Sequence, residues 1–174
     1  MKRTILSLSI AGLILASCGG SDTKTEAPAD ATTEAPAAES AAPAETPNAN
    51  VAEVTITGGD DMKFDLTEIK VKEGQTVKLT IAHTGTSPKT AMGHNWVLLA
   101  QGVNIEDYSN AAINAAATDY IPADKAKDVI VHTKLIGGGE SDTIEFPAPA
   151  KGTYDFLCTF PGHHATMRGK FIVE

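Results

Sequence analysis

Cysteine is scarce in this chain of 174 residues, which contains only Cys18 and Cys158. If Cys18 is covalently modified, as argued below, Cys158 has no partner within the chain and cannot form an intramolecular disulfide. A lone thiol in an exported protein needs an explanation. Ligation to a metal supplies one, because a metal-bound thiolate is deprotonated and protected.

Clusters of basic residues and long apolar runs are also missing. The 22 acidic residues exceed the 14 lysines and arginines, for a net charge of −8. No basic patch could follow a phosphate backbone, which excludes a nucleic acid as partner. The apolar run Ile5–Leu15 is too short for a membrane span, which needs about 20 residues.

The N-terminus has the features of a targeting segment. Lys2 and Arg3 precede the apolar run, which ends in Leu15-Ala16-Ser17-Cys18-Gly19. This pattern resembles the lipobox of bacterial lipoproteins, in which the signal is cut before a cysteine that is then acylated; a plain secretory signal is the alternative. We expect residues 1–17 to be a signal peptide. Cys18 would then anchor the protein to a membrane of the bacterial cell envelope, on the periplasmic side or at the cell surface.

Residues 18–50 are predicted to form a disordered tether that begins at the acylated cysteine. Alanine, proline and acidic residues dominate this stretch, and it contains no aromatic residue. Such a composition cannot bury enough apolar surface to offset the entropy lost on ordering. Proline and charge repulsion should keep the segment extended. It could let the following domain search for partners, or it could be a passive spacer.

Residues 51–174 have the size of a single domain, and strand signals dominate them. Short apolar stretches, several with alternating polarity, are separated by Gly, Pro and Asp turns, which indicates an all-β fold built as a two-sheet sandwich. The predicted strands are Val51–Thr57, Ile69–Val71, Thr76–Ala82, Asn95–Ala100, Asp128–Thr133, Ser141–Phe146, Gly152–Cys158 and Gly169–Val173. The alanine-rich segment Ile105–Ala117 predicts a short helix within one long connection.

The segment Cys158–Met167 concentrates metal-ligating side chains. It places Cys158, His163 and Met167 at spacings of five and four residues, and a distant His94 completes a set of two His, one Cys and one Met. This set is typical of mononuclear blue-copper sites that transfer electrons. Soft sulfur ligands favour Cu(I), whereas imidazole suits both oxidation states, and this compromise suits a one-electron carrier.

Each of these side chains also has a purely structural interpretation. Cys158 could be a buried structural thiol, and Met167 could fill a gap in the core. The spacing of both residues relative to His163 favours the metal site over these alternatives.

Three blocks of sequence carry a resemblance to a known family. They are Met92–Leu98 (MGHNWVL), His132–Glu140 (HTKLIGGGE) and Cys158–His163 (CTFPGH). In this order they closely resemble azurin, and the resemblance extends over residues 53–173, although the third block alone would also fit other cupredoxins. Azurins are small exported proteins with a type 1 copper. They fold as a Greek-key β-sandwich with a helical flap and shuttle single electrons.

Position by position, the resemblance implies a role for each residue of the site. The implied ligands of one copper ion are the carbonyl of Gly93, His94, Cys158, His163 and, as a weak axial ligand, Met167. Glycine at position 93 would let the backbone approach the metal. Asn95 would tie the His94 loop to the Cys158 loop by hydrogen bonds and so fix the ligand geometry.

The resemblance also implies a docking surface for other redox proteins, such as cytochromes or copper oxidoreductases. His163 should be the ligand nearest the surface. The apolar ring expected around it comprises Met62, Met92, Phe160, Pro161 and Gly162. A small apolar patch suits brief, weak docking.

Other polar residues are expected to lie outside the ligand set. His83 matches an azurin position close to the site, and His132 should have a structural or surface role. His164 should point away from the metal and add pH-dependent charge near the docking surface. The pair Asp60-Asp61 is interpreted as an ordinary turn.

The chain departs from the azurin pattern in two places. Most azurins carry a disulfide at the base of the sandwich, but the corresponding region around Val54 and Gly74 has no cysteine. His164 and Thr166 stand where small and apolar residues are usual, which changes the polarity beside the ligands.

Three functions are compatible with the ligand set. We favour a membrane-tethered electron carrier that is not an enzyme. A module for copper storage or delivery would favour an exposed, methionine-rich site, and the chain has only four methionines. A copper enzyme such as a reductase would need a second metal site or an open coordination position.

Overall fold

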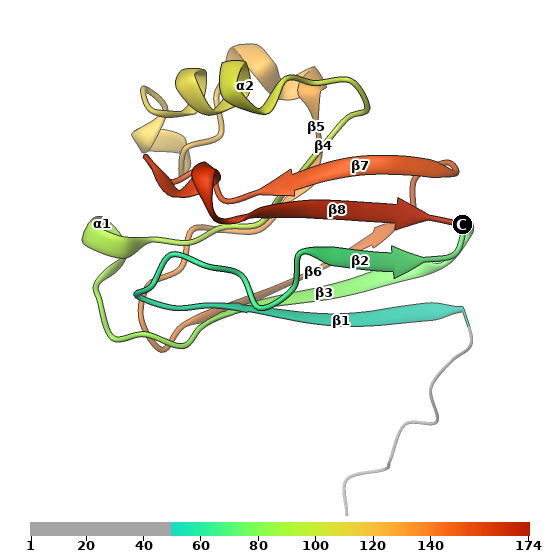
Figure 1. Ribbon diagram of the computed structural model, residues 1–174, viewed down its shortest axis with the longest axis horizontal. Helices are drawn as coiled ribbons and strands as arrows, with labels where there is room; N and C mark the ends of the chain where they lie inside the picture. Colours follow the sequence, from blue (N-terminus) through green and yellow to red (C-terminus); the bar gives the residue numbers. More distant parts are fainter. Residues whose placement is uncertain (1–49) are drawn as a thin grey trace, which may run out of the picture. The chain divides into compact units, whose positions relative to one another are not determined.

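Eight strands in two sheets form the framework of residues 50–174, the part of the chain that the computed structural model describes (Figure 1). The predicted signal peptide, the predicted lipidation site Cys18 and all but the last residue of the predicted tether lie outside this part and remain predictions. All eight predicted strands are present, with shifts of one or two residues at their ends, and the prediction of an all-β sandwich is confirmed.

The sheets differ in size, and strands consecutive in sequence are distributed between them. The smaller sheet has the order β1 (Val51–Gly58), β3 (Thr76–His83) and β6 (Ser141–Pro147). The larger has the order β2 (Glu68–Val71), β8 (Arg168–Val173), β7 (Gly152–Leu157), β4 (Val97–Leu99) and β5 (Val129–His132). The pairs β1–β3 and β2–β8 are parallel, and all other pairs are antiparallel.

Side-chain alternation fixes which face of each strand enters the core. In β3, Val77, Leu79, Ile81 and His83 are buried, whereas the residues between them are only partly buried. This period of two is the period of a pleated strand with one face against the opposite sheet. His83 is the last buried residue of the strand, so the alternation places its imidazole inside the end of the sandwich.

Aromatic rings fill the centre between the sheets. Trp96 is fully buried and lies 5.6 to 6.1 Å from the rings of Phe146, Phe156 and Phe171. Tilted and edge-on ring contacts at such distances are the favoured geometries for aromatic pairs. This cluster anchors the strands that lead into the loops at one end of the sandwich.

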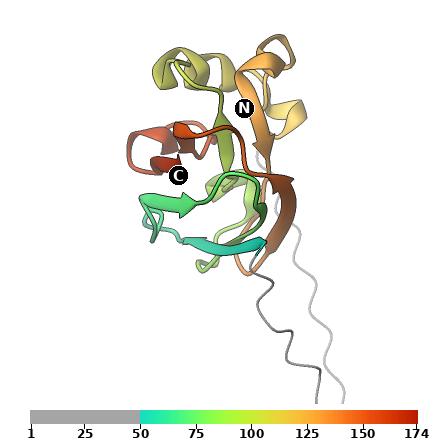
Figure 2. The ribbon, with the colours of Figure 1, turned by 90° about the vertical axis from the view of Figure 1, so that its right-hand side faces the viewer.

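A helical flap occupies the connection between β4 and β5, and the view along the strands shows it on the side of the molecule away from β1 (Figure 2). Helix α2 runs over Ile105–Ala112 and begins at Asn104, whose side chain accepts a hydrogen bond from the Asp107 amide at 3.1 Å. The predicted helix Ile105–Ala117 was too long, because the observed helix ends at Ala112. Asn114 follows two residues later, and asparagine is a residue type whose side chain competes for backbone hydrogen bonds.

Short helical turns complete the connections. The 3-10 turns η1 (Ala116–Thr118) and η2 (Ala123–Asp128) belong to the flap, and η3 (His163–Ala165) lies between β7 and β8. Helix α1 (Lys89–Met92), which the sequence analysis did not predict, precedes β4. None of the helices in residues 50–174 combines the length and apolar character that crossing a membrane requires.

Candidate metal centre

Two loops meet at the end of the sandwich where β4 begins and β7 ends. These strands are antiparallel neighbours, and Val97 pairs with Leu157. Residues just before β4 and just after β7 therefore lie side by side. His94 comes from the first segment and Cys158 from the second, and the chain from Cys158 to Met167 closes on itself through a hydrogen bond of 2.9 Å between the Cys158 amide and the Met167 carbonyl.

Three predicted ligands converge on one point. His94, Cys158 and His163 are buried, and each offers a donor atom that lies within 4.8 Å of the other two. The two histidine Nδ1 atoms are 3.2 Å apart, and Cys158 Sγ is 3.7 Å from His163 Nδ1. Because His94 is far from the other two residues in the sequence, this convergence is produced by the fold.

The two predicted axial groups lie beside this cluster. The Gly93 carbonyl oxygen is 3.9 Å from Cys158 Sγ, and Met167 is fully buried. A Cβ atom on Gly58 would come within 2.8 Å of the Met167 methyl carbon and 3.2 Å of the His94 ring. The absence of a side chain at Gly58 therefore leaves room for the thioether next to the imidazole, a role that the sequence analysis missed.

Local packing also requires glycine at position 93. A Cβ atom there would lie 2.6 Å from the Lys89 carbonyl oxygen and 3.0 Å from the Leu135 side chain. The backbone of α1 and a core leucine therefore exclude a side chain from this position.

A hydrogen bond made by the Nε2 atom of His94 sets the tautomer of this imidazole. Its Nε2 lies 3.0 Å from the Gly59 carbonyl oxygen, so the Nε2–H donates and Nδ1 keeps its lone pair for the centre. Hydrogen bonds of this kind orient metal-ligating histidines and fix their tautomer. His94 thus presents Nδ1 as a ligand atom.

The His83 ring stacks on the His94 ring, with ring centroids 4.3 Å apart and 14° between the planes. Its Nε2 donates to the Met92 carbonyl at 2.8 Å, and its Nδ1 accepts from the Gly85 amide at 3.0 Å. Both nitrogens are engaged, so His83 supports the site without ligating, as predicted.

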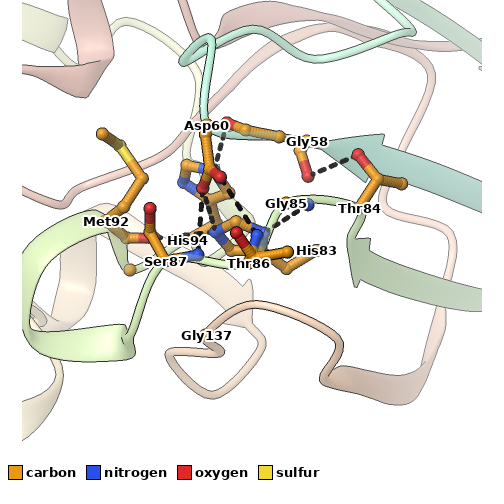
Figure 3. A network of polar contacts seen from close by, with 12 residues as sticks. Gly58, Asp60, His83, Thr84, Gly85, Thr86, Ser87, Met92, His94 and Gly137 are labelled. Atoms are coloured by element: carbon orange, nitrogen blue, oxygen red, sulfur yellow. Dashed lines mark hydrogen bonds and ion pairs between the residues drawn. The ribbon is translucent and has the colours of Figure 1, made fainter.

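Asp60 holds the loop next to His83, and the close view shows its carboxylate pointing into that loop (Figure 3). It accepts hydrogen bonds from the amides of Thr86 at 3.0 Å and Ser87 at 3.3 Å, and it lies 4.0 Å from His83 Nε2. The hydrogen bond from Thr86 lowers the pKa of Asp60. Asp60 and Asp61 lie in a turn, as predicted, and the Met62 amide closes it by donating to the Gly59 carbonyl at 3.1 Å. The role of Asp60 in holding the neighbouring loop was not predicted. Its partners are 26 and 27 residues away, and no local pattern could have indicated them.

Asn95 connects the two ligand loops as the resemblance implied. Its amide nitrogen donates to Thr159 Oγ1 at 2.7 Å, and its oxygen accepts from the Thr159 amide at 2.8 Å. The same nitrogen also lies 3.0 Å from the Asp119 carbonyl oxygen in the flap. Asn95 therefore links three segments around Cys158.

Burial sets the protonation of the cluster without metal. It raises the pKa of Cys158 to about 11, although the backbone amides of Asn95 and Phe160 partly oppose this. Burial and the neighbouring His94 lower the pKa of His163 to about 4, and burial also lowers the pKa of His94. At neutral pH both imidazoles are neutral and ready to bind, whereas the thiol must lose a proton when a metal enters.

The predicted docking residues differ in exposure. Met62 is 40% exposed, Met92 and Pro161 are partly buried, and Gly162 is exposed. Phe160 is only 9% exposed and packs on the His163 ring with centroids 4.7 Å apart, so it supports the ring more than it lines the surface. His163 is 2% exposed, whereas His94, Cys158 and Met167 are fully buried.

The donor set fits copper. A thiolate and two imidazoles in a buried cluster, with a thioether and a carbonyl beside them, match the ligand preferences of a blue-copper centre. Of the remaining histidines, His132 and His164 lie outside the cluster, as predicted.

Comparisons with known proteins agree with this geometry. Residues 50–174 match the family described as copper binding proteins, plastocyanin/azurin family. Outer membrane protein H.8 of Neisseria gonorrhoeae is 43% identical over 120 residues, which cover 67% of this chain and 64% of that protein's length. An azurin of Pseudomonas fluorescens biotype C is 38% identical over 128 residues, covering 67% of this chain and 93% of the azurin.

A solved structure shows the same fold. The dithionite-reduced auracyanin of Roseiflexus castenholzii superimposes with a TM-score of 0.63 at 38% identity, covering 71% of this chain and 97% of the auracyanin. This chain belongs to the plastocyanin/azurin family of copper-binding proteins, and its cofactor is copper.

Proposed function

We propose that this protein is a one-electron carrier with a mononuclear type 1 copper site, tethered to a bacterial membrane, and that it passes electrons between redox proteins. The observation that carries the proposal is the buried cluster of His94, Cys158 and His163, whose donor atoms lie within 4.8 Å of one another. Family membership supports copper-based electron transfer.

Each residue of the site has a distinct task in this proposal. Cys158 Sγ and the Nδ1 atoms of His94 and His163 would hold the copper, together with the Met167 thioether and the Gly93 carbonyl. The bound copper supplies a one-electron couple. The chain keeps water out, and the hydrogen bonds of His94 and Asn95 hold the ligands in place, so that little moves when an electron arrives.

Burial favours a carrier over a storage or delivery module. The four side chains that would ligate copper are at most 2% exposed, whereas labile delivery suits an exposed site. An enzyme would need an open coordination position or a second metal site. Within residues 50–174, the cluster described here is the one group of three or more His, Cys, Asp or Glu residues placed to hold a metal.

Docking would occur over His163. Met62, Met92, Pro161 and Gly162 provide partly exposed, uncharged surface, and Phe160 supports the imidazole from beneath. A small apolar surface suits weak, transient contact with cytochromes or copper oxidoreductases. Replacing Met62 by Lys should slow electron exchange with such a partner and leave the copper spectrum unchanged.

Membrane attachment would occur through Cys18. The lipobox-like sequence supports this location, as does the similarity to a relative named an outer membrane protein. Acylation of Cys18 can be tested by labelling cells with a fatty acid. The label should appear in the wild-type protein and be absent from the Cys18→Ala variant.

A Cu(II) titration of the purified metal-free protein tests the copper site. One equivalent should produce an intense blue band and a narrow copper hyperfine splitting, and mild reductant should bleach the band. The Cys158→Ser variant should lose the band, because the thiolate is its source. A colourless complex of the wild-type protein, or a Cys158→Ser variant that stays blue, would refute the proposed ligand set.

A further inference from the structure

Glu106 connects the flap to the turn that carries two of the predicted copper ligands, His163 and Met167. It lies in the first turn of α2, and its two carboxylate oxygens have different partners. His164 Nε2 lies 3.0 Å from Oε2, and Arg168 Nη1 lies 3.4 Å from Oε1. These partners are 58 and 62 residues further along the chain, so the contact joins two separate segments.

The two partners of Glu106 flank the ligands directly. His164 follows His163, and Arg168 follows Met167. Between them, the amides of Thr166 and Met167 both donate to the His163 carbonyl, at 3.1 and 2.8 Å. One carboxylate therefore holds both ends of the short turn from which the imidazole and the thioether project.

The opposite side of this turn is held by a different contact. Thr166 Oγ1 donates to the Met62 carbonyl at 2.6 Å, which ties the turn to the loop after β1. Contacts with Glu106 and Met62 therefore fix the turn between the flap and the loop after β1. His164 and Thr166, the two residues that depart from the azurin pattern, supply one contact each.

We propose that Glu106 is a positioning residue of the copper site: it restrains the turn that carries His163 and Met167, so that their geometry changes little between Cu(I) and Cu(II). This inference rests on the proposed electron-transfer function. Glu106 does not contact the ligands, and it acts through the side chains that follow them. Exposed ion pairs contribute little to global stability, so its effect should be local.

The chain offers a matched control for this proposal. Asp107 is also an acidic residue in the first turn of α2, and it is exposed. Glu106→Ala and Asp107→Ala each remove one negative charge and one favourable interaction with the helix N-terminus, and alanine preserves the helix. Only Glu106→Ala also removes the contacts with His164 and Arg168. Glu106→Gln keeps a hydrogen-bond acceptor and serves as the conservative variant.

Two measurements on the copper-loaded full chain test the proposal. The first is hydrogen exchange at the amides of Thr166 and Met167, which report opening of the turn. It should accelerate about two- to fivefold in Glu106→Ala, the factor that corresponds to a surface ion pair, and stay unchanged in Asp107→Ala. The second is the electron self-exchange rate together with the copper hyperfine splitting. The rate should fall and the splitting should change in Glu106→Ala, and Glu106→Gln should restore both in part.

The outcomes separate this inference from the proposed function. Equal behaviour of Glu106→Ala and Asp107→Ala in both measurements would overturn the positioning role. Faster amide hydrogen exchange in Glu106→Ala, with an unchanged electron self-exchange rate and copper hyperfine splitting, would also overturn it. Glu106 would then restrain the turn without affecting the geometry of the copper site. A wild-type protein that binds copper without a blue band would instead overturn the proposed function, and amide exchange alone would then show whether Glu106 holds the turn.

Discussion

His163 loses nearly all contact with water when the protein folds, and this loss changes its acid–base chemistry. The Phe160 ring covers one face, and 2% of the residue stays exposed. Burial, with the nearby His94, lowers the pKa of His163 to about 4, below the value of about 6.5 expected in the unfolded chain. Between these two pH values the unfolded state binds a proton that the folded state excludes.

Acid should therefore destabilise the metal-free protein. The contribution of His163 is fully present above about pH 6.5 and is lost as the pH falls towards 4, by up to about 3 kcal/mol. Urea unfolding of the metal-free protein at pH 7.5, 5.5 and 4.5 measures this loss. In the His163→Asn variant, which cannot titrate at this position, the decline should be smaller. An equal decline in the free energy of unfolding of the wild-type protein and of His163→Asn would contradict the assignment of this pH dependence to His163.

Met167 offers a direct test of the axial ligand. Replacing it by Leu nearly conserves volume in the core, so the fold should persist. The copper should remain bound and its reduction potential should rise, because a weak donor to Cu(II) is replaced by an apolar side chain, whose surroundings favour the less charged Cu(I). The exposed Met62 provides the control: Met62→Leu should leave the potential unchanged in voltammetry. A lower or unchanged potential in Met167→Leu would mean that the thioether is not a ligand.

The residues of the site divide into those that the sequence could indicate and those that it could not. Cys158, His163 and Met167 were recognisable from their spacing, and His94 from the block around it. The supporting roles of Gly58, Asp60 and Glu106 were missed. Each depends on a contact with a distant segment, and the residue types themselves are common at turns and helix starts.

At the scale of elements, two loops on the smaller sheet lock together around His83. The loop after β1 supplies the Gly59 carbonyl to His94 and the Asp60 carboxylate to the amides of Thr86 and Ser87. The loop after β3 returns a hydrogen bond from the Thr84 amide to the Gly58 carbonyl at 2.8 Å. The position of Gly59, and with it the orientation of His94, depends on this interlocking.

Asp60→Ala should loosen the interlocked loops, and Asp61→Ala should not. Asp61 is an exposed neighbour of the same charge, and within the described part of the chain its side chain makes no hydrogen bond or ion pair. Asp60→Ala leaves the amides of Thr86 and Ser87 without their acceptor, so its urea midpoint should fall below that of Asp61→Ala. Its copper reduction potential should also differ from that of Asp61→Ala, because the hydrogen bond to His94 is disturbed. Identical urea midpoints and copper reduction potentials in the two variants would show that Asp60 does not hold the two loops together.

Strands were more predictable than helices because their signal extends over the whole element. Alternation in β1 and β3 specifies both the strand and its buried face. The four-residue helix α1 and the 3-10 turns are too short to show a periodicity, and they are stabilised by contacts with the loops around them. Strand β4 is shorter than predicted: just before Val97, the Trp96 amide donates to the Thr133 hydroxyl at 2.9 Å instead of to a backbone carbonyl.

At the scale of the whole molecule, packing holds the two sheets of residues 50–174 together, and no disulfide lies between them in this described part. Cys158 is the free cysteine of the described region, and it is committed to the metal centre. The core relies on buried aliphatic side chains and on the aromatic cluster around Trp96. Near Val54, where most azurins carry a disulfide partner, β1 is joined to β3 by backbone pairing, with Val54 opposite Leu79.

The metal-free protein should therefore be less stable than a metal-free azurin that carries the disulfide. A disulfide restricts the unfolded chain and typically contributes about 2–4 kcal/mol. Bound copper would obscure this difference, because any ligand that binds the folded state adds to its stability. Denaturant unfolding of both metal-free proteins should give a lower midpoint here, and reduction of the azurin disulfide should bring the two midpoints closer. Equal midpoints and slopes before reduction would mean that packing near Val54 compensates fully for the missing bridge.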